Sequence, residues 1–327
     1  MDNLLDLMIC RIPGLKANER VELIKKFDRE DDFSILTIKD IENITGRVLE
    51  KAPKKIKMNE IRSIKMNEIR SMAEKDAERA KKLGIRIVSW REESYPPLLR
   101  EIYDPPALLF YRGVLPNPLK PMAAVVGTRR PSSQGANRAF EIGLELGKAG
   151  IPVVSGLALG IDSMAHRGNI EALSPTIAVL GSSPDMVYPV ANRFLAKRIL
   201  DTGGVILSEY PPLTGPRKWN FPERNRIISG LARGTIIVEA PEKSGALITA
   251  RFAVEQNRDL WVDKAGISQA HSAGTARLAK EGALIFSSVK DTLAEWRLEG
   301  TSSEMKADKD EAAGLVPSMA AYLGIKL

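Results

Sequence analysis

The residues best suited to recognise a ligand gather in one segment, residues 218–226, KWNFPERNR. This segment places fixed positive charges around an aromatic ring and then continues into an apolar helical pattern. Cations hold a phosphate backbone, and an exposed ring gives a base a surface on which to stack. The segment therefore predicts a site for single-stranded nucleic acid. Its candidate binding residues are Lys218, Phe221, Arg224, Asn225 and Arg226.

A second candidate segment, GTRRPSS, begins at Gly127, directly after a predicted strand. Gly127 permits a tight turn, and the planar guanidinium of Arg129 suits a phosphate group. The segment lacks the Gly-x-Gly-x-x-Gly spacing of dinucleotide-binding proteins, and the bulk of Arg129 and Arg130 would obstruct a pyrophosphate. A structural alternative is that the glycine only turns the chain and that one arginine pairs with an acid.

Residues 155–166, SGLALGIDSMAH, form a third candidate. Ser155 and Gly156 precede a predicted helix with Asp162 as its N-cap, so free backbone N–H groups at this end could receive an anion. His166 follows Asp162 by about one helical turn, and we expect a capping or packing role for it rather than catalysis.

Residues 239–250, EAPEKSGALITA, form a fourth candidate. Lys243 is expected to reach a phosphate and Ser244 to lie at the helix N-terminus. Glu239 is interpreted as a structural partner of Arg224 or Arg226 rather than a general base. No histidine or metal-binding cluster accompanies these residues, so no proton shuttle or nucleophile is evident and no enzyme activity is expected.

Short apolar runs, each followed by a helical stretch, would position these segments. Strands are predicted over residues 85–90, 107–111, 123–127, 151–155, 176–181, 204–209, 235–239, 260–263 and 283–286. Apolar strands that alternate with helices are typical of a mostly parallel sheet covered on both faces. The predicted fold is an α/β, extended Rossmann-like, doubly wound domain over residues 84–296. Ligands of such sheets bind beyond the carboxyl ends of the strands, where all four candidate segments fall.

The first 82 residues are predicted to form a small all-helical domain of the SAM-like or helix-hairpin type. Residues 57–72 hold a tandem copy, KMNEIRSI then KMNEIRSM, which indicates one long amphipathic helix. On that helix Met58, Ile61, Met66, Ile69 and Met72 would share one face. Residues 297–327 are expected to be a short tail without a winged-helix domain.

The composition of the chain indicates which kinds of partner and cofactor to expect. The chain has 327 residues and a formal net charge of +7, which favours an anionic partner. One cysteine excludes an intramolecular disulfide and fits a reducing cytoplasm, and two histidines make a zinc site improbable. No apolar run is long enough to cross a membrane, and no secretory leader opens the chain. We therefore expect no metal, no cofactor and no membrane association.

Six ordered blocks together resemble the DNA-processing protein A (DprA, or Smf) family over residues 84–296. They are GTR from Gly127; SGLAxGIDxxAH from Ser155; AVLG from Ala178 with YPxxN from Tyr188; SE from Ser208; FPxRNRIISGL from Phe221; and KSGxLITA from Lys243.

The resemblance implies a protein of natural transformation and competence that binds and protects incoming single-stranded DNA. It further implies loading of the RecA recombinase in DNA recombination, and a homodimer joined through the Rossmann-like domain. By the same resemblance Arg129, Lys218, Phe221, Arg224 and Lys243 line the DNA groove. Contacts from Ser155, Gly156, Asn225 and Ser244 would then shape it.

The sequence departs from the family where a Val-Pro-Gly turn is common, since residues 262–266 read VDKAG here. Two alternatives remain open: a sensor of a small nucleotide, and a phosphoribohydrolase-like enzyme. The second requires Pro-Gly-Gly-x-Gly-Thr-x-x-Glu. Aligned on Pro241, that motif puts Glu242 and Lys243 in place of glycines, and Thr249 in place of the catalytic glutamate.

Overall fold

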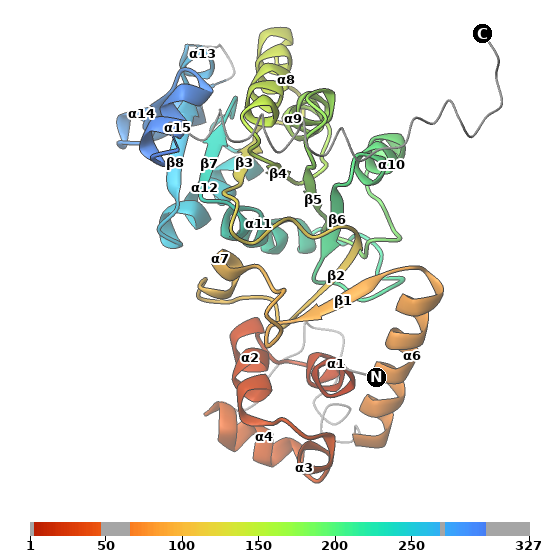
Figure 1. Cartoon of the computed structure of the whole chain (residues 1–327). Helices are drawn as coiled ribbons and strands as arrows, with labels where there is room; N and C mark the ends of the chain where they lie inside the picture. Colours follow the sequence, from red (N-terminus) through yellow and green to blue (C-terminus); the bar gives the residue numbers. More distant parts are fainter. Residues whose placement is uncertain (1–2, 47–65, 269–271, 299–327) are drawn as a thin grey trace, which may run out of the picture.

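One mixed sheet organises the chain. The computed structural model describes residues 3–46, 66–268 and 272–298. Within these residues nine strands form a single sheet in the order β1-β2-β6-β5-β4-β3-β7-β8-β9 (Figure 1). The strands are β1 (Arg86–Ser89), β2 (Leu108–Gly113), β3 (Ala123–Val126), β4 (Val153–Ser155), β5 (Ile177–Val179), β6 (Val205–Ser208), β7 (Gly234–Ile237), β8 (Asp259–Asp263) and β9 (Leu284–Phe286).

The sheet is mostly parallel. In the sheet order, every neighbouring pair from β6 through β5, β4, β3, β7 and β8 to β9 is parallel. The pairs β1–β2 and β2–β6 are antiparallel. The central strands β3, β4, β5, β6 and β7 are buried throughout, as continuous apolar runs require when helices cover both faces. Each predicted strand segment overlaps one observed strand, and the predicted Rossmann-like α/β fold is confirmed.

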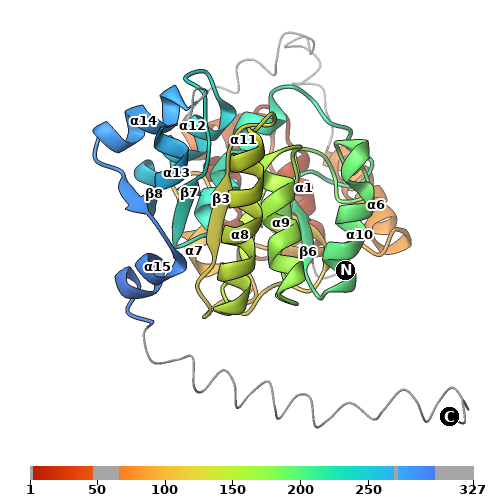
Figure 2. The same ribbon diagram turned by 90° about the horizontal axis from the view of Figure 1, so that it is seen from above.

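Helices cover both faces of the sheet. α8 and α9 lie on one face and α11 and α12 on the other (Figures 1 and 2). Glycines bring α8 and α9 close together, because a Cβ on Gly168 would stand 1.9 Å from the Phe140 carbonyl oxygen. The helices of this region are α7 (Pro97–Arg100), α8 (Ser133–Lys148), α9 (Ile161–Glu171), η1 (Val190–Asn192), α10 (Arg193–Asp201), α11 (Asn220–Leu231), α12 (Gly245–Glu255), α13 (Lys264–Ile267), α14 (Ala273–Lys280) and α15 (Val289–Glu295).

The N-terminal helices pack at the β1–β2 end of the molecule (Figure 1). Their apolar cluster continues into Leu108 and Phe110 of β2, and the Arg91 guanidinium donates to the Asp6 carboxylate at 2.8 Å. The N-terminal helices therefore share an apolar core with the β1–β2 end of the sheet. A domain boundary at residues 82–84 remains a prediction. The helices are α1 (Leu4–Arg11), α2 (Ala17–Lys26), α3 (Glu30–Ser34), α4 (Ile38–Thr45) and α6 (Met66–Lys82).

Helix α6 contains residues 66–72 of the second copy of the tandem segment, whereas Lys65 and the first copy lie outside the described residues. Its buried positions are Ile69, Ala73, Asp76 and Ala80, which follow helical spacing. Of the residues predicted to share one face, Ile69 is fully buried whereas Met72 is 44% exposed. Most of the predicted C-terminal tail also lies outside the described residues. None of the described helices is long and apolar enough to cross a membrane.

Candidate nucleic-acid interface

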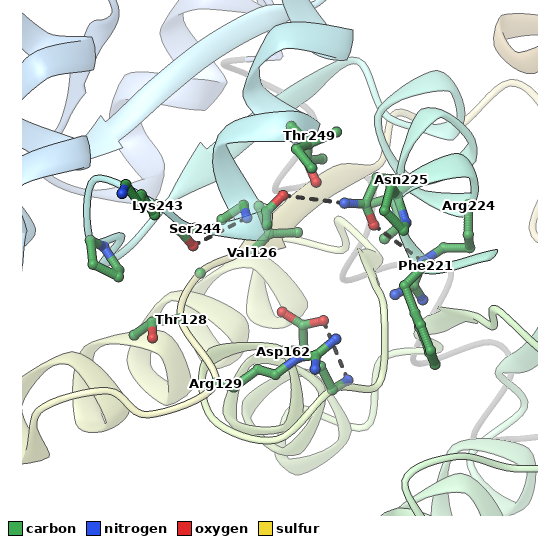
Figure 3. A pocket seen from close by; sticks show the side chains of 18 of the residues that line it. Val126, Thr128, Arg129, Asp162, Phe221, Arg224, Asn225, Lys243, Ser244 and Thr249 are labelled. Atoms are coloured by element: carbon green, nitrogen blue, oxygen red, sulfur yellow. Dashed lines mark hydrogen bonds between the residues drawn. The ribbon is translucent and has the colours of Figure 1, made fainter. Parts of the chain in front are cut away.

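A cavity of about 680 Å³ lies beyond the carboxyl ends of β3 and β7. We call it the sheet-edge cavity. Figure 3 shows labelled side chains on three walls of the cavity: Thr128 and Arg129 on the first, Phe221, Arg224 and Asn225 on the second, and Lys243 and Ser244 on the third. Its lining is Val126, Gly127, Thr128, Arg129, Arg130, Ala158, Asp162, Tyr188, Lys218, Phe221, Pro222, Arg224, Asn225, Ile228, Pro241, Lys243, Ser244, Gly245, Ala246, Ile248 and Thr249.

The first wall is the loop from β3 to α8. Gly127 is required there by space, because an added Cβ would stand 2.5 Å from Ile161 Cγ1 and 2.8 Å from the Glu239 carbonyl oxygen. The Thr128 N–H donates to that same Glu239 oxygen at 2.8 Å, which fixes the loop against the end of β7. Arg129 and Arg130 follow as exposed side chains. The glycine therefore lets the loop pass close to its neighbours and present two arginines.

The second wall is the first turn of α11. The Asn220 side-chain amide donates to the Gly181 carbonyl oxygen at 2.8 Å, which anchors this turn to the loop after β5. Phe221 is half-buried, and the Arg129 guanidinium lies 5.6 Å from its ring centroid. The Tyr188 ring lies 5.7 Å from the Phe221 ring, centroid to centroid, with 46° between the planes. An aromatic surface flanked by a cation therefore faces the cavity.

Arg224 lines the same wall but acts as an anchor. It is 4% exposed, and its Nη1 donates to the carbonyl oxygens of Gly156, at 2.9 Å, and Val179. An added Cβ on Gly156 would stand 2.5 Å from Arg224 Nη2, so this glycine makes room for the guanidinium. Burial lowers the pKa of Arg224 to about 10, against the opposing attraction of Asp162. Arg224 thus ties α11 to the ends of β4 and β5.

Asp162 is the one carboxylate among the lining residues. The predicted N-cap role is wrong, because Gly160 occupies that position and α9 begins at Ile161. Asp162 instead accepts hydrogen bonds from the backbone N–H groups of Gly156, at 3.1 Å, and Ala158, at 3.3 Å. Burial raises its pKa, whereas the charge of Arg224 opposes that rise. The carboxylate therefore fixes the loop after β4.

The third wall is the loop from β7 to α12. Ser244 is the N-cap of α12, as predicted, and its hydroxyl accepts from the Ala246 N–H at 3.2 Å. Lys243 is exposed beside it. The Asn225 amide donates to the Gly245 carbonyl oxygen at 3.2 Å and so joins the second and third walls. The N-terminus of α12, which favours negative charge, opens toward the cavity.

The charges on the three walls are strongly unbalanced. Within the part of the chain that the structure describes, no ion pair engages the exposed cations Arg129, Arg130, Lys218 or Lys243. The single lining carboxylate is buried and hydrogen-bonded. The cavity can therefore receive a polyanion, and the exposed edge of Phe221 can contact an aromatic base.

Two predicted site residues lie elsewhere. Arg226 is 5% exposed; its Nε bonds Asp104 at 3.0 Å and its Nη2 bonds Glu209 at 2.6 Å. Because it follows Arg224 by two residues, it projects from nearly the opposite side of α11. Ser155 is fully buried, and its hydroxyl donates to the Val125 carbonyl oxygen at 2.7 Å, because β4 is an interior strand.

Arg226 lines a second cavity of about 530 Å³, which we call the interdomain cavity. The N-terminal helices form one side of it, with Arg11 and Asp76 as an ion pair in its wall.

The prediction that Glu239 pairs with Arg224 or Arg226 is wrong. The Glu239 carboxylate accepts from the Ser132 N–H at 3.1 Å and from the Ser132 hydroxyl at 2.7 Å.

Tyr188 and Thr249, to which the sequence patterns assign no role, also line the sheet-edge cavity. Tyr188 belongs to the YPxxN block, so the pattern marked the segment without revealing that its ring packs on Phe221. Gly156 contributes from behind the cavity, through its backbone contacts with Arg224 and Asp162.

His166 is fully buried behind the cavity. Thr176 Oγ1 donates to the Val153 carbonyl oxygen at 2.8 Å, so it accepts from His166 Nδ1, also at 2.8 Å. Burial lowers the pKa of His166 to about 3, which keeps the ring neutral. Among the described residues no group of three or more His, Cys, Asp or Glu side chains could hold a metal ion.

The structure therefore belongs to a recognisable class, a Rossmann-like domain with a cavity at the carboxyl edge of its sheet. Aromatic rings line this cavity, together with cations that have no ion-pair partner among the described residues. Residues 86–297 match the family model described as DNA recombination-mediator protein A. The chain is 36% identical over 290 residues to DNA processing protein DprA of Bacillus subtilis, and the match covers 88% of this chain and 94% of that protein.

Two solved structures are similar as well. DprA from Streptococcus pneumoniae superposes with a TM-score of 0.73 at 35% identity, covering 90% of this chain and 98% of its own. DprA from Helicobacter pylori, described for its single-stranded DNA binding mode, has a TM-score of 0.57 at 30% identity and covers 66% and 96%. This chain belongs to the DNA recombination-mediator protein A family.

Proposed function

We propose that this chain binds single-stranded DNA in the sheet-edge cavity. The observation that carries the proposal is the set of exposed, unpaired cations around Phe221, which are Arg129, Lys218 and Lys243. Cations of this kind neutralise successive phosphates while a ring contacts a base, and neither contact depends strongly on sequence. The single-stranded DNA binding mode described for the Helicobacter pylori relative supports the same class of ligand.

We propose that the protein performs no bond-breaking chemistry on this DNA. The two buried side chains best suited to act as a general acid or base already have hydrogen-bond partners. Asp162 accepts two backbone hydrogen bonds, and His166 is neutral and hydrogen-bonded to Thr176. His166 does not line the sheet-edge cavity, and the Asp162 carboxylate that lines it is held by the loop after β4, so neither group is arranged to exchange a proton with a bound strand.

Family membership supports a further proposal about the cellular role. We infer that the protein protects incoming strands in natural transformation and delivers them to the RecA recombinase in the cytoplasm, as a homodimer joined through its Rossmann-like domain.

Fluorescence anisotropy with a labelled oligothymidine tests the DNA-binding proposal. The double variant Arg129→Ala/Lys218→Ala should lose about tenfold or more in affinity. It should also flatten the plot of log affinity against log salt by roughly 0.7 for each phosphate that the protein no longer neutralises. An unchanged affinity would show that the sheet-edge cavity is not the DNA site.

A matched control removes the same charge from the opposite edge of the sheet. Lys120 precedes β3 and Lys148 ends α8, and both are exposed. Lys120→Ala/Lys148→Ala should therefore bind DNA almost as the parent protein does.

Thermal-shift measurements test the alternative that the protein is a sensor of a small nucleotide. Stabilisation by mononucleotides alone would favour a sensor over a DNA-binding protein.

A further inference from the structure

Tyr188 presents a second aromatic surface at one end of the sheet-edge cavity. Its side chain is 45% exposed although its ring packs against Phe221. It also lines a small adjoining hollow of about 70 Å³ with Arg129, Leu159 and Pro189. Arg129, Tyr188 and Phe221 line both spaces, so the larger cavity continues into the smaller one past the two rings.

The segment that carries Tyr188 is fixed by hydrogen bonds on both sides. Before it, the Ser182 hydroxyl donates to the Met186 carbonyl oxygen at 2.7 Å, and the Met186 N–H donates to the Ser183 carbonyl oxygen at 2.9 Å. After it, the buried Asn192 amide donates to the Leu157 carbonyl oxygen at 2.9 Å. The backbone on both sides of Tyr188 is therefore fixed and its ring rests on Phe221, which lowers the ordering cost of binding.

A residue that served only to pack would be expected to bury its ring. Tyr95 does so, since it is 0% exposed and its hydroxyl donates to the Pro106 carbonyl oxygen at 2.8 Å. Tyr188 instead keeps nearly half of its surface open, next to an exposed, unpaired arginine. A fixed, accessible ring beside a cation has the composition of a base-stacking platform on a phosphate-binding groove.

We propose that Tyr188 is a second stacking platform, so that a strand bound at Phe221 continues over Tyr188 toward Leu159 and Pro189. This inference rests on the proposed DNA binding and extends its footprint by at least one nucleotide. The two planes are inclined by 46°, so the bases that contact them belong to two differently tilted nucleotides rather than to one continuous stack.

Affinity measurements on three variants test the platform. Tyr188→Ala should lower the affinity for an oligothymidine by about five- to tenfold, whereas Tyr188→Phe, which keeps the ring, should bind nearly as the parent protein does. Phe194→Ala is the matched control, because Phe194 is 73% exposed and does not line the cavity. Equal affinities for Tyr188→Ala and the parent would overturn the inference.

Cross-linking on the unmodified protein tests the contact directly and avoids any folding defect of a variant. Oligonucleotides with 5-iododeoxyuridine at successive positions should photo-cross-link to Tyr188 and to Phe221 from different nucleotides, as mapped by mass spectrometry. Cross-links at Phe221 with none at Tyr188 would overturn the platform. That result would leave DNA binding itself intact, whereas the Arg129→Ala/Lys218→Ala variant tests DNA binding independently of Tyr188.

Discussion

The two sides of α11 face cavities whose cations are in opposite situations, exposed on one side and buried in ion pairs on the other. On the side of the sheet-edge cavity, Arg129 and Lys218 face open space without a carboxylate partner among the described residues. On the side of the interdomain cavity, Arg226 is buried between Asp104 and Glu209. The difference shows that pairing and exposure, rather than residue type, separate a cation that can bind a ligand from one that maintains the fold.

Arg224 is an intermediate case. It lines the sheet-edge cavity, yet its guanidinium is buried on two backbone carbonyl groups. Its charge therefore adds to the positive potential of the site, while its hydrogen bonds hold the walls together. Loss of Arg224 would affect both properties at once, which makes it a poor probe of either, whereas Arg226 and Lys243 test them separately.

The largest effect is expected from Arg226→Ala. The substitution leaves the Glu209 and Asp104 carboxylates without their partner, and breaking a buried ion pair costs about 3 kcal/mol or more of unfolding free energy. Urea unfolding followed by circular dichroism measures the change. Lys218→Ala is the control from the exposed side of the same segment and should leave stability within about 0.5 kcal/mol of the parent. Similar unfolding midpoints for the two variants would contradict a structural role for Arg226.

The next effect concerns pH and the buried His166 behind the cavity. Its pKa is about 3 in the folded protein, against 6.5 for an unperturbed histidine, so only the unfolded chain takes up this proton between those values. The stability it contributes is present above pH 6.5 and is lost as the pH falls toward 3, by about 1.4 kcal/mol per unit. Denaturant unfolding at pH 6.5 and pH 4 should therefore reveal a loss on the order of 3 kcal/mol from this group.

The control for this prediction is His166→Gln, which has no titrating ring. Its absolute stability is expected to be lower, but the part of the acid-induced decline that comes from His166 should disappear. If parent and variant lose stability in parallel between pH 6.5 and pH 4, His166 is not held neutral as the structure indicates.

The smallest effect is expected from Lys243→Ala, which removes a single unpaired cation from the third wall. DNA affinity should fall by about three- to tenfold and the salt dependence should weaken by roughly 0.7, with no change in melting temperature. Anisotropy and thermal unfolding on the same sample provide both readings. A loss of stability without a loss of affinity would place Lys243 with Arg226 among the structural cations.

Much of the fold could be predicted from the sequence, because buried parallel strands must be continuous apolar runs between helices. The same logic located the loops around Gly127, Phe221 and Ser244, which the structure brings to one cavity. Two predicted site residues lie away from that cavity for geometric reasons. Ser155 lies on an interior strand, and Arg226 lies two residues beyond Arg224 and so projects from another side of α11.

Sequence patterns alone specify the alternation of strands and helices, the position of the cationic loops and the family to which the chain belongs. The tertiary structure is needed to show which charges are paired, because a partner such as Asp104 is distant from Arg226 in the chain and adjacent to it in space. It also decided that Tyr188 packs on Phe221, since two loops that follow different strands meet only when those strands share a sheet. Local patterns report burial and periodicity, whereas the free energy of a charge depends on neighbours supplied by the whole fold.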